Sequence, residues 1–203
     1  MPDAEKALFY KYLDQASNYF EFGSGGSTYQ AAIRDNIKKI YSVESDQGWQ
    51  KHLKENIKLP QEPLLNRSDD SDDTIVDQKS IRYIYVDMDT KPNNMGYPGD
   101  KSSLDDWRKY YLAMHNLTPD QISKIDLILI DGRFRVSCAL RIFPLINSDA
   151  IICFDDFDRK YYHIVLDYYD IIEKTGRMVI LKRKSYITPP GKYLLENYQS
   201  VSW

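Results

Sequence analysis

Cysteine, long apolar runs and an excess of one charge are all scarce in this 203-residue sequence. The two cysteines, Cys138 and Cys153, lie among apolar residues and belong to no CxxC pair or histidine-rich cluster. This usage argues against a disulfide framework and against a structural zinc site. It favours a reducing compartment, and we expect the protein to be cytoplasmic.

No apolar run approaches the roughly 18 residues that a membrane span requires, and the start at Met1 has none of the regions of a signal peptide. With 27 basic and 30 acidic residues the formal net charge is -3. The broad positive footprint of a nucleic-acid-binding protein is therefore absent. We expect a single soluble domain over residues 1–203, with no membrane span and no nucleic acid partner.

Short apolar runs alternate with apolar stripes at helical spacing. The runs predict strands at residues 18–22, 39–43, 81–86, 125–130 and 150–154. The stripes predict helices around residues 8–16, 49–57 with Asp46 as the cap, 104–114, and 161–172 with an end at Gly176. Strands that alternate with helices, and that are apolar on both faces, are typical of a doubly wound α/β sheet.

Two stretches interrupt this alternation. Residues 66–77 are rich in aspartate and serine but have neither the central glycine nor the closing glutamate of a calcium loop, which predicts a solvated connection. Residues 90–100 are rich in turn formers and follow a predicted strand end, where open α/β sheets bind ligands. A substrate loop and a plain connector are both compatible with this second stretch.

The most informative segment is the glycine-rich stretch at residues 19–28. A predicted strand runs directly into Gly23, Gly25 and Gly26, and a helix is expected from about Ser27. Glycines at such a point let the backbone turn tightly and let a ligand approach the free amides at the start of the helix.

An acidic residue follows at the end of the next predicted strand. Glu44 lies 44 − 21 = 23 residues beyond Glu21, where a carboxylate can accept both hydroxyls of a ribose. A GxxxxGK[ST] phosphate loop is absent, and the dinucleotide fingerprint GxGxxG/A fails at Thr28. Glu21 lies outside that fingerprint and suits a ligand with a positive charge and an amino acid end.

Residues 21–28 resemble motif I of the class I S-adenosylmethionine-dependent methyltransferases, whose pattern is acid-x-Gly-x-Gly-x-small. The resemblance covers nearly the whole chain, through Glu44 and the predicted strand ends at Asp131 and residues 155–156. It implies a Rossmann-like, doubly wound, mostly parallel seven-stranded sheet with helices on both faces. Ser27 stands where a third glycine often lies, a variant that this family tolerates.

The same resemblance implies S-adenosylmethionine as the cofactor and S-adenosylhomocysteine as its product. The glycine loop would hold the methionine part, Glu44 the ribose, and Asp87, at the end of the third predicted strand, the adenine. The implied cofactor-binding residues are Glu21, Gly23, Ser24, Gly25, Ser27, Thr28, Glu44, Ser45, Asp87 and Asp131.

Residues 131–140, together with residues 96–98, resemble a narrower subgroup. It includes bacterial proteins and the methyltransferase part of large-virus glycan enzymes, such as those of chlorella viruses. This resemblance implies a sugar or glycan acceptor, neighbouring glycosyltransferase domains as partners, and the host cytoplasm if the protein is viral. The abrupt end at Trp203 favours a domain cut from a larger glycan-synthesis protein.

An oxygen atom is the favoured methyl acceptor. Amino-methylating nucleic-acid enzymes of this fold carry an Asn/Asp-Pro-Pro-aromatic motif after the fourth strand, where residues 131–134 read Asp-Gly-Arg-Phe. Asp131, Asp155 and Asp156 follow neighbouring predicted strands and should converge beside the cofactor. Such a cluster suits Mg²⁺ or Mn²⁺, which could bind vicinal hydroxyls and lower the pKa of one of them.

Two alternatives to this metal site stay open. Without a metal, Asp155, Asp156 or His163 would serve as the general base. Asp156 could instead cap a helix that begins near Asp158, with His163 lying on its surface.

Several other side chains have two interpretations. Arg133 and Arg135 could bind an acidic or polyhydroxylated acceptor, or could pair with the nearby aspartates, and we favour acceptor binding for Arg133. Tyr97 is the expected sugar-stacking residue. The helical spacing of Trp107 predicts packing, and His52 is expected to face solvent.

The sequence thus predicts an S-adenosylmethionine-dependent O-methyltransferase that acts on a sugar hydroxyl of a glycan or glycoconjugate. One alternative is an O-methyltransferase for a catechol-like or natural-product acceptor. A nucleotide-binding dehydrogenase would need Gly or Ala in place of Thr28. A third possibility is a methyltransferase-like binding module without catalysis.

Overall fold

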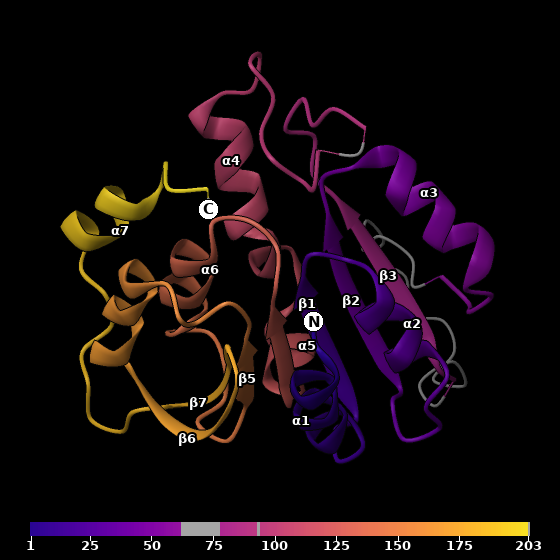
Figure 1. Cartoon of the computed structure of the whole chain (residues 1–203), viewed down its shortest axis with the longest axis horizontal. Coiled ribbons are helices and arrows are strands. Elements are labelled where there is room, and N and C mark those ends of the chain that lie inside the picture. Colours follow the sequence, from indigo (N-terminus) through magenta and orange to yellow (C-terminus); the bar gives the residue numbers. More distant parts are fainter. Residues whose placement is uncertain (62–77, 93, 203) are drawn as a thin grey trace.

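Seven strands form one sheet with helices on both faces (Figure 1). The computed structural model describes residues 1–61, 78–92 and 94–202. The acidic stretch at residues 66–77, which we expect to be a solvated connection, lies outside the described residues. No helix in the described ranges is both long enough and apolar enough to cross a membrane.

The sheet has the strand order β3-β2-β1-β4-β5-β7-β6, and β7 alone runs antiparallel to its neighbours. Its strands are β1 (Asn18–Phe22), β2 (Lys39–Glu44), β3 (Ser80–Tyr85), β4 (Leu127–Ile130), β5 (Ile151–Phe154), β6 (Tyr169–Thr175) and β7 (Met178–Arg183). The five strands predicted from apolar runs are confirmed, with ends that shift by two residues at most. The doubly wound, mostly parallel seven-stranded sheet is confirmed as well.

The helices alternate with the strands as the apolar stripes predict. They are α1 (Asp3–Leu13), α2 (Gly26–Ala32), α3 (Gln47–Asn56), α4 (Leu104–Tyr111), α5 (Pro119–Ser123), α6 (Arg135–Ile142) and α7 (Lys192–Tyr198), with 3-10 helices η2 (Ala113–Asn116) and η3 (Lys160–Asp167). The side chain of Asp46 accepts the backbone N–H of Trp49 at 3.0 Å, so the predicted cap of α3 is confirmed.

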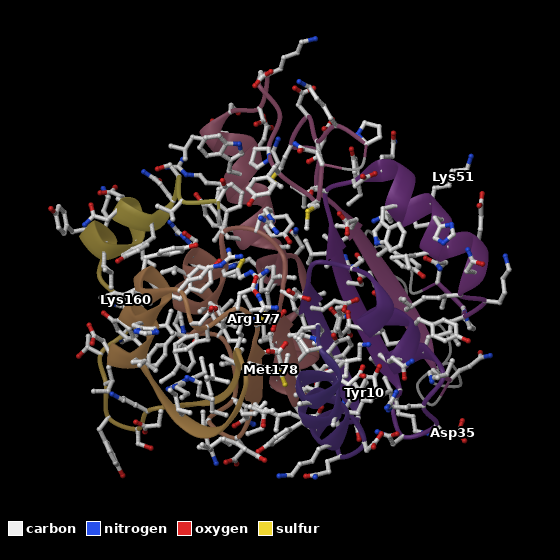
Figure 2. All side chains as sticks on the ribbon, viewed as in Figure 1. Tyr10, Asp35, Lys51, Lys160, Arg177 and Met178 are labelled. Atoms are coloured by element: carbon white, nitrogen blue, oxygen red, sulfur yellow. The ribbon has the colours of Figure 1, made fainter. Side chains whose placement is uncertain are left out.

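The alternation of side chains along the central strands divides the core into two layers. Tyr19 and Leu129 point to the face that α1 and α2 cover, whereas Phe20 and Ile128 point to the face beneath α4, α6 and η3. All four side chains are fully buried. Strands buried on both faces in this way are typical of a parallel sheet covered by helices on both sides. In Figure 2, Arg177 lies toward the centre of the molecule, whereas Lys51 and Lys160 lie at its periphery.

The helix predicted around residues 161–172 is wrong in its second half. Only η3 is helical there, and Tyr169–Thr175 forms β6, which pairs with β7 in an antiparallel hairpin. Ile171 and Ile172, which continue the apolar stripe in the sequence, are 43% and 48% exposed on this edge strand. Gly176 turns the hairpin with a φ of +56°, a conformation that glycine adopts without strain.

The strand order places a crevice beside β1. The helices that follow β1 and β4, α2 and α6, lie on opposite faces of the sheet. Open α/β sheets bind ligands at such a switch point, outside the carboxyl ends of the strands.

Candidate functional site

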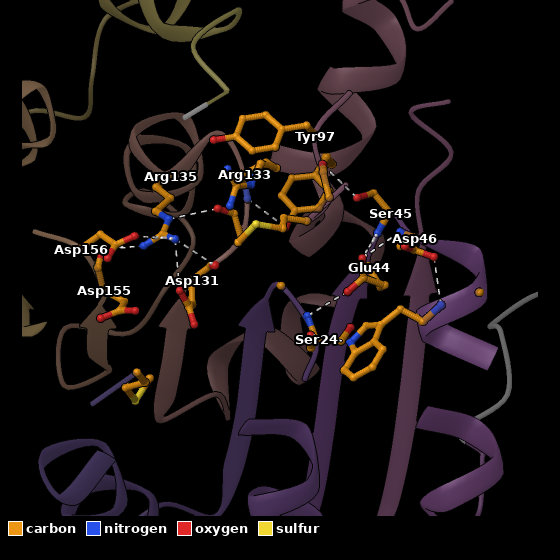
Figure 3. A pocket seen from close by; sticks show the side chains of 18 of the residues that line it. Ser24, Glu44, Ser45, Asp46, Tyr97, Asp131, Arg133, Arg135, Asp155 and Asp156 are labelled. Atoms are coloured by element: carbon orange, nitrogen blue, oxygen red, sulfur yellow. Dashed lines mark hydrogen bonds and ion pairs between the residues drawn. The ribbon is translucent and has the colours of Figure 1, made fainter. Parts of the chain in front are cut away.

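A cavity of about 1000 Å³ opens at the carboxyl ends of β1, β2, β4 and β5 (Figure 3). One half is bounded by the glycine loop and by the residues after β2, including Ser24, Glu44 and Ser45. The other half contains Asp131 and Asp155 at neighbouring strand ends. A cavity of this size can hold a nucleoside-sized ligand and a second molecule beside it.

The loop after β1 and the loop after β4 touch through two glycines. A Cβ atom on Gly23, whose φ is +96°, would lie 2.7 Å from the Cα atom of Gly132. A Cβ atom on Gly132 would lie 2.0 Å from the hydroxyl of Tyr110. Side chains are therefore excluded at both positions, and the close contact fixes the separation between the glycine loop and Asp131.

Glu21 lies beneath the glycine loop and does not line the cavity. Its carboxylate is fully buried and accepts hydrogen bonds from four hydroxyls, those of Tyr19, Ser27, Thr28 and Ser42. Burial is the main influence on the pKa of Glu21 and raises it, whereas these hydrogen bonds lower it. The structure thus gives Glu21 a role in shaping the loop from below.

The other loop residues divide between the cavity wall and this support. Gly23 and Ser24 line the cavity. The backbone N–H of Gly25 donates to the Thr28 hydroxyl at 2.9 Å, which holds the start of α2 in place. Ser27 lines a second, smaller cavity between α1 and α2, which Asp131 also borders.

Glu44 is the carboxylate of the cavity floor at the end of β2. It is 7% exposed, and it accepts backbone N–H groups of Ser45 at 2.7 Å, Asp46 at 2.8 Å and Ser24 at 3.2 Å. A carboxylate offers about four acceptor positions, so at most one remains for a ligand. In this conformation Glu44 can accept one ribose hydroxyl but not both. Burial raises its pKa, and the backbone hydrogen bonds oppose that rise.

The structure does not bring Asp87 into the cavity. Val86 and Met88 are buried on either side of it, and the alternation of side chains turns Asp87 toward solvent. The contact of Asp87 with adenine stays a prediction that the cavity lining does not support. Residues that do line this end of the cavity include Trp49 and Met95.

Trp49 is not part of the apolar packing face of α3. Its side chain is 43% exposed, its Nε1–H donates to the carbonyl of Ser24 at 3.0 Å, and its ring stacks on His52 at 5.2 Å between centroids. His52 is exposed as predicted, yet both rings border the cavity. The apolar stripe predicts the burial of Leu53 correctly, but Trp49, one turn earlier in the helix, does not share that burial.

Asp131 and Asp155 form a carboxyl pair at the ends of β4 and β5. Burial is the largest influence on Asp131; it outweighs the lowering effect of Arg135, and Asp155 adds a further increase by its charge and by a hydrogen bond. Together they raise the pKa of Asp131 to about 7. Its side chain is still 33% exposed, so a ligand in the cavity can reach it. Asp155 is buried, and its Oδ1 atom has no hydrogen-bond partner.

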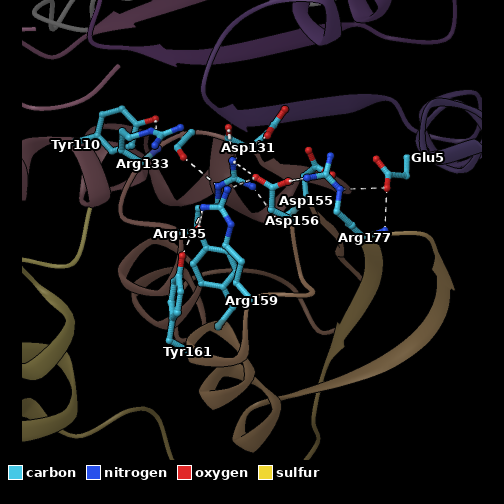
Figure 4. A network of polar contacts seen from close by, with 12 residues as sticks. Glu5, Tyr110, Asp131, Arg133, Arg135, Asp155, Asp156, Arg159, Tyr161 and Arg177 are labelled. Carbon is cyan, nitrogen blue, oxygen red and sulfur yellow. Dashed lines mark hydrogen bonds and ion pairs between the residues drawn. The ribbon is translucent and has the colours of Figure 1, made fainter. Parts of the chain in front are cut away.

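Asp156 is held by guanidinium groups (Figure 4). Its carboxylate lies 2.7 Å from Arg177, 3.0 Å from Arg159 and 3.3 Å from Arg135. Asp156 therefore does not join Asp131 and Asp155, and no metal-binding group of three acidic, histidine or cysteine side chains occurs within the described ranges. The arrangement gives no support to Asp156 as a metal ligand, because its single carboxylate is already paired with three guanidinium groups.

The capping role of Asp156 and the general-base role of His163 do not fit the structure, whereas the surface position expected for His163 does. The Asp156 side chain caps no helix, since η3 begins at Lys160 and no side chain caps it. His163 lies outside the cavity, where its ring stacks on Phe157 at 5.1 Å and its Nε2 atom is 3.0 Å from the Phe157 carbonyl. A general base must reach the proton that it removes. His163 is therefore a surface residue, as the second alternative expects.

The two predicted arginines have different roles. Arg135 is buried and binds the backbone carbonyls of Gly132 at 3.0 Å and Asp155 at 2.7 Å, so it ties the loops after β4 and β5 together. Arg133 lines the cavity, and its guanidinium lies over the ring of Tyr97, 4.2 Å from the centroid. Tyr97, the predicted sugar-stacking residue, also lines the cavity.

Sequence reasoning missed Arg159 and Arg177, which complete the cavity wall on the β5 side. Because β7 is antiparallel to β5, its beginning lies at the ligand-binding edge of the sheet, and Arg177 immediately precedes it. A second contact joins Arg177 to α1, since Glu5 accepts its backbone N–H at 2.8 Å. For Arg159 the sequence does contain a signal, because an arginine three residues after Asp156 can form an ion pair with it.

Comparison with known proteins places the fold. No protein-family model matches the chain, and no curated protein sequence matches it either. Among solved structures, a methyltransferase-like protein from Silicibacter pomeroyi superposes with a TM-score of 0.78 at 25% identity, over 99% of this chain and 96% of that one.

More distant structures share the same architecture. An O-methyltransferase from Bacillus cereus in complex with SAH has a TM-score of 0.52 at 12% identity, over 89% of this chain and 80% of that one. An rRNA methylase from Streptococcus thermophilus has a TM-score of 0.52 at 8% identity, over 90% of this chain and 98% of that one. The chain therefore has the Rossmann-like fold of the class I S-adenosylmethionine-dependent methyltransferases.

Proposed function

We propose that this protein is an S-adenosylmethionine-dependent O-methyltransferase that methylates a sugar hydroxyl of a glycan or glycoconjugate. One observation carries the proposal. The cavity is lined on one side by Glu44, a buried carboxylate that can accept a hydrogen bond from a ribose. On the other side it is lined by Asp131, a reachable carboxyl group whose pKa is raised. The contact between Gly23 and Gly132 sets the separation between the two. The fold of the matching structures supports methyl transfer as the reaction.

The cavity fits an S-adenosyl group. Glu44 has one acceptor position left for a ribose hydroxyl, and the hydroxyl of Ser45, which lies in the same wall, is a neighbouring partner. Trp49 and Met95 line the same end of the cavity, and in this proposal their side chains contact the adenine. Gly23 and Ser24 leave room for the thioether chain, which would run toward Asp131. When bound, the cofactor supplies an electrophilic methyl group on a sulfonium.

Asp131 is the general base in this proposal. As the acceptor's hydroxyl oxygen forms a bond to the methyl carbon, the bond between that carbon and sulfur breaks, and the hydroxyl proton passes to Asp131. A pKa of about 7 lets the carboxylate take a proton more readily than an ordinary aspartate does. Asp155 and Arg135 keep the Asp131 side chain at the end of β4. The step is written without a metal, because Asp156, one of the three carboxylates of the predicted metal site, is paired with three arginines; a requirement for Mg²⁺ or Mn²⁺ stays a prediction.

The sugar acceptor rests on the resemblance of residues 131–140 and 96–98 to glycan methyltransferases, and on the polar wall formed by Arg133 and Tyr97. The viral glycan enzymes, the glycosyltransferase partners and the larger parent protein stay predictions. Cys138 and Cys153 are free and buried, which agrees with the cytoplasmic location that we propose.

Calorimetric titration with S-adenosylhomocysteine and with NAD⁺ tests the cofactor. We expect dissociation constants on the order of micromolar for S-adenosylhomocysteine and no binding of NAD⁺. Transfer of a labelled methyl group from S-adenosylmethionine to sugars and to catechols then tests the acceptor. Tight binding of NAD⁺ alone would refute the cofactor, and transfer to catechols alone would favour a small-molecule enzyme. Binding without transfer to any hydroxyl would indicate a binding module.

The pH dependence of methyl transfer should report the Asp131–Asp155 pair. A base must be deprotonated, so kcat/KM is expected to rise with pH through an apparent pKa of about 7. The charge of Asp155 and its hydrogen bond both raise the pKa of Asp131. Asp155→Asn removes that charge and should move the rise to lower pH. The control is Asp158→Asn, an exposed carboxylate outside the cavity. A profile that stays in place, or moves to higher pH, would show that Asp131 is not the base.

A further inference from the structure

Four arginines line the cavity, and Arg133 differs from the other three. Arg135 pairs with Asp131 and Asp156, and Arg159 and Arg177 pair with Asp156 as well. For Arg133 no carboxylate oxygen lies within 4.0 Å in the part of the chain that the structure describes. Its guanidinium is a positive charge at the cavity wall with no anionic partner from the protein.

This lone charge is also buried. Arg133 is only 8% exposed, and its Nε–H has no hydrogen-bond acceptor. An unpaired buried charge is costly, and proteins ordinarily neutralise one with an ion pair or with a bound ligand. Tyr97 lies over the guanidinium at 4.2 Å, but a ring below the plane leaves the N–H donors at the edge of that plane unused.

The backbone of Arg133 is held firmly. Its N–H donates to the hydroxyl of Tyr110 at 3.3 Å, and its carbonyl accepts the thiol of Cys138 at 3.5 Å. Tyr110 and Cys138 are both buried. These contacts fix the backbone of Arg133, and the Tyr97 ring below the guanidinium orients its plane. A fork of donors oriented in this way suits bidentate binding of a carboxylate or a phosphate.

We propose that Arg133 binds an anionic group, a carboxylate or a phosphate ester, of the methyl acceptor. This assignment rests on the proposed function, since it takes Glu44 as the ribose site. Gly96 places Arg133 in that half of the cavity, because a Cβ atom on Gly96 would lie 3.3 Å from the Ser45 hydroxyl and 3.7 Å from Cγ of Arg133. In the proposed binding mode the glycine loop would hold the methionine part and with it the carboxylate of the cofactor, and the adenosine part has no negative charge. The anion at Arg133 therefore belongs to the second molecule.

The acceptor class that follows is an acidic sugar, such as a uronic acid, or a sugar that carries a phosphate. Tyr97 is 36% exposed beside the guanidinium, so a sugar ring can stack on it while its acidic group reaches Arg133. Neutral sugars would lose the charged contact and bind more weakly.

The test is calorimetric titration of the protein, free and saturated with S-adenosylhomocysteine, with inorganic phosphate, D-glucuronate and neutral D-glucose. We expect both anions to bind at low salt and glucose to bind at least about tenfold more weakly. Arg133→Gln should weaken both anions by about tenfold or more, and Arg133→Lys should restore part of the affinity as a point charge without the fork. Arg108→Gln, which removes an exposed arginine of α4, is the matched control and should change nothing.

Two cofactor fragments separate the sources of the anion. S-adenosylhomocysteine has the amino acid carboxylate, whereas 5′-methylthioadenosine has none. If Arg133→Gln weakens the first but not the second, the anion is the cofactor's own; if it weakens both, Arg133 contacts the adenosine part. Either result overturns the acceptor assignment, and so does anion affinity that is equal in wild type and Arg133→Gln. Thermal unfolding verifies that each variant is folded.

Failure of the proposed function gives a different pattern. Wild-type protein that binds phosphate through Arg133 but does not bind S-adenosylhomocysteine would refute the cofactor and leave an anion site. Wild-type protein that binds S-adenosylhomocysteine but neither anion would refute the anion site and leave the methyltransferase proposal intact.

Discussion

Asp131→Asn is expected to reduce methyl transfer by about 10²–10⁴-fold, which is the contribution typical of a general base. The amide cannot take the hydroxyl proton, and it keeps nearly the same size at the end of β4. Arg135, which lies 3.1 Å from the Asp131 carboxylate, retains Asp156 as its partner, so the loop should stay in place. Single-turnover rates with labelled S-adenosylmethionine measure the loss, and calorimetry should show S-adenosylhomocysteine bound within about threefold of wild type.

Asp87→Asn is the matched control for this variant. It makes the same chemical change at a strand end, on a side chain that faces solvent outside the cavity. Wild-type turnover is expected. If Asp131→Asn retains turnover within tenfold, the base lies elsewhere, whereas an equal loss in Asp87→Asn would support the adenine-side role predicted for Asp87.

Glu44→Ala is expected to weaken S-adenosylhomocysteine binding on the order of 100-fold. A hydrogen bond to a charged acceptor contributes roughly 1.5–3 kcal/mol, and the variant also leaves the amides of Ser24, Ser45 and Asp46 without their acceptor. The loop that lines the ribose site then loses its anchor. Calorimetric titration gives the affinity, and thermal unfolding separates a local loss from a global one.

Two further variants sharpen this measurement. Glu44→Gln keeps one oxygen acceptor but turns an NH₂ group toward backbone N–H donors, so an intermediate loss is expected. Glu55→Ala removes an exposed carboxylate of α3 and should bind as wild type does. Near-normal affinity in Glu44→Ala would place the ribose elsewhere in the cavity.

Local patterns predicted Gly23, Ser24, Glu44 and Ser45, which line one half of the cavity. Each signal there lies within one strand-loop-helix unit, where the alternation along β1 and the glycines at its end determine which atoms face the ligand. Glu44 follows from the same logic one strand later. The exception is Asp87, because β3 ends before it and Val86 and Met88 take the buried positions.

The other half of the cavity, around Asp131 and Asp155, is formed by contacts between residues that are distant in the sequence, which local patterns do not predict. Asp155 and Asp156 are adjacent in the chain, but consecutive side chains leave a strand in opposite directions, and Asp156 has a φ of +57°. One therefore meets Asp131 while the other meets three arginines. Arg177 reaches this cluster only because β7 is antiparallel. The sequence did not predict this hairpin, because Ile171 and Ile172, which are exposed on β6, have the spacing of an apolar helical stripe.

The contact between Gly23 and Gly132 has a consequence for engineering. It holds the loops after β1 and β4 against each other, so redesign of these loops cannot freely change the distance from the proposed cofactor site to Asp131, the proposed base. A library of variants that aims at new acceptors should leave both glycines unchanged. It should vary the cavity-lining residues Tyr97, Arg133 and Met95 instead. Substitutions at these positions should change which acceptor binds, while the contact between the two glycines keeps Asp131 in its position beside the glycine loop.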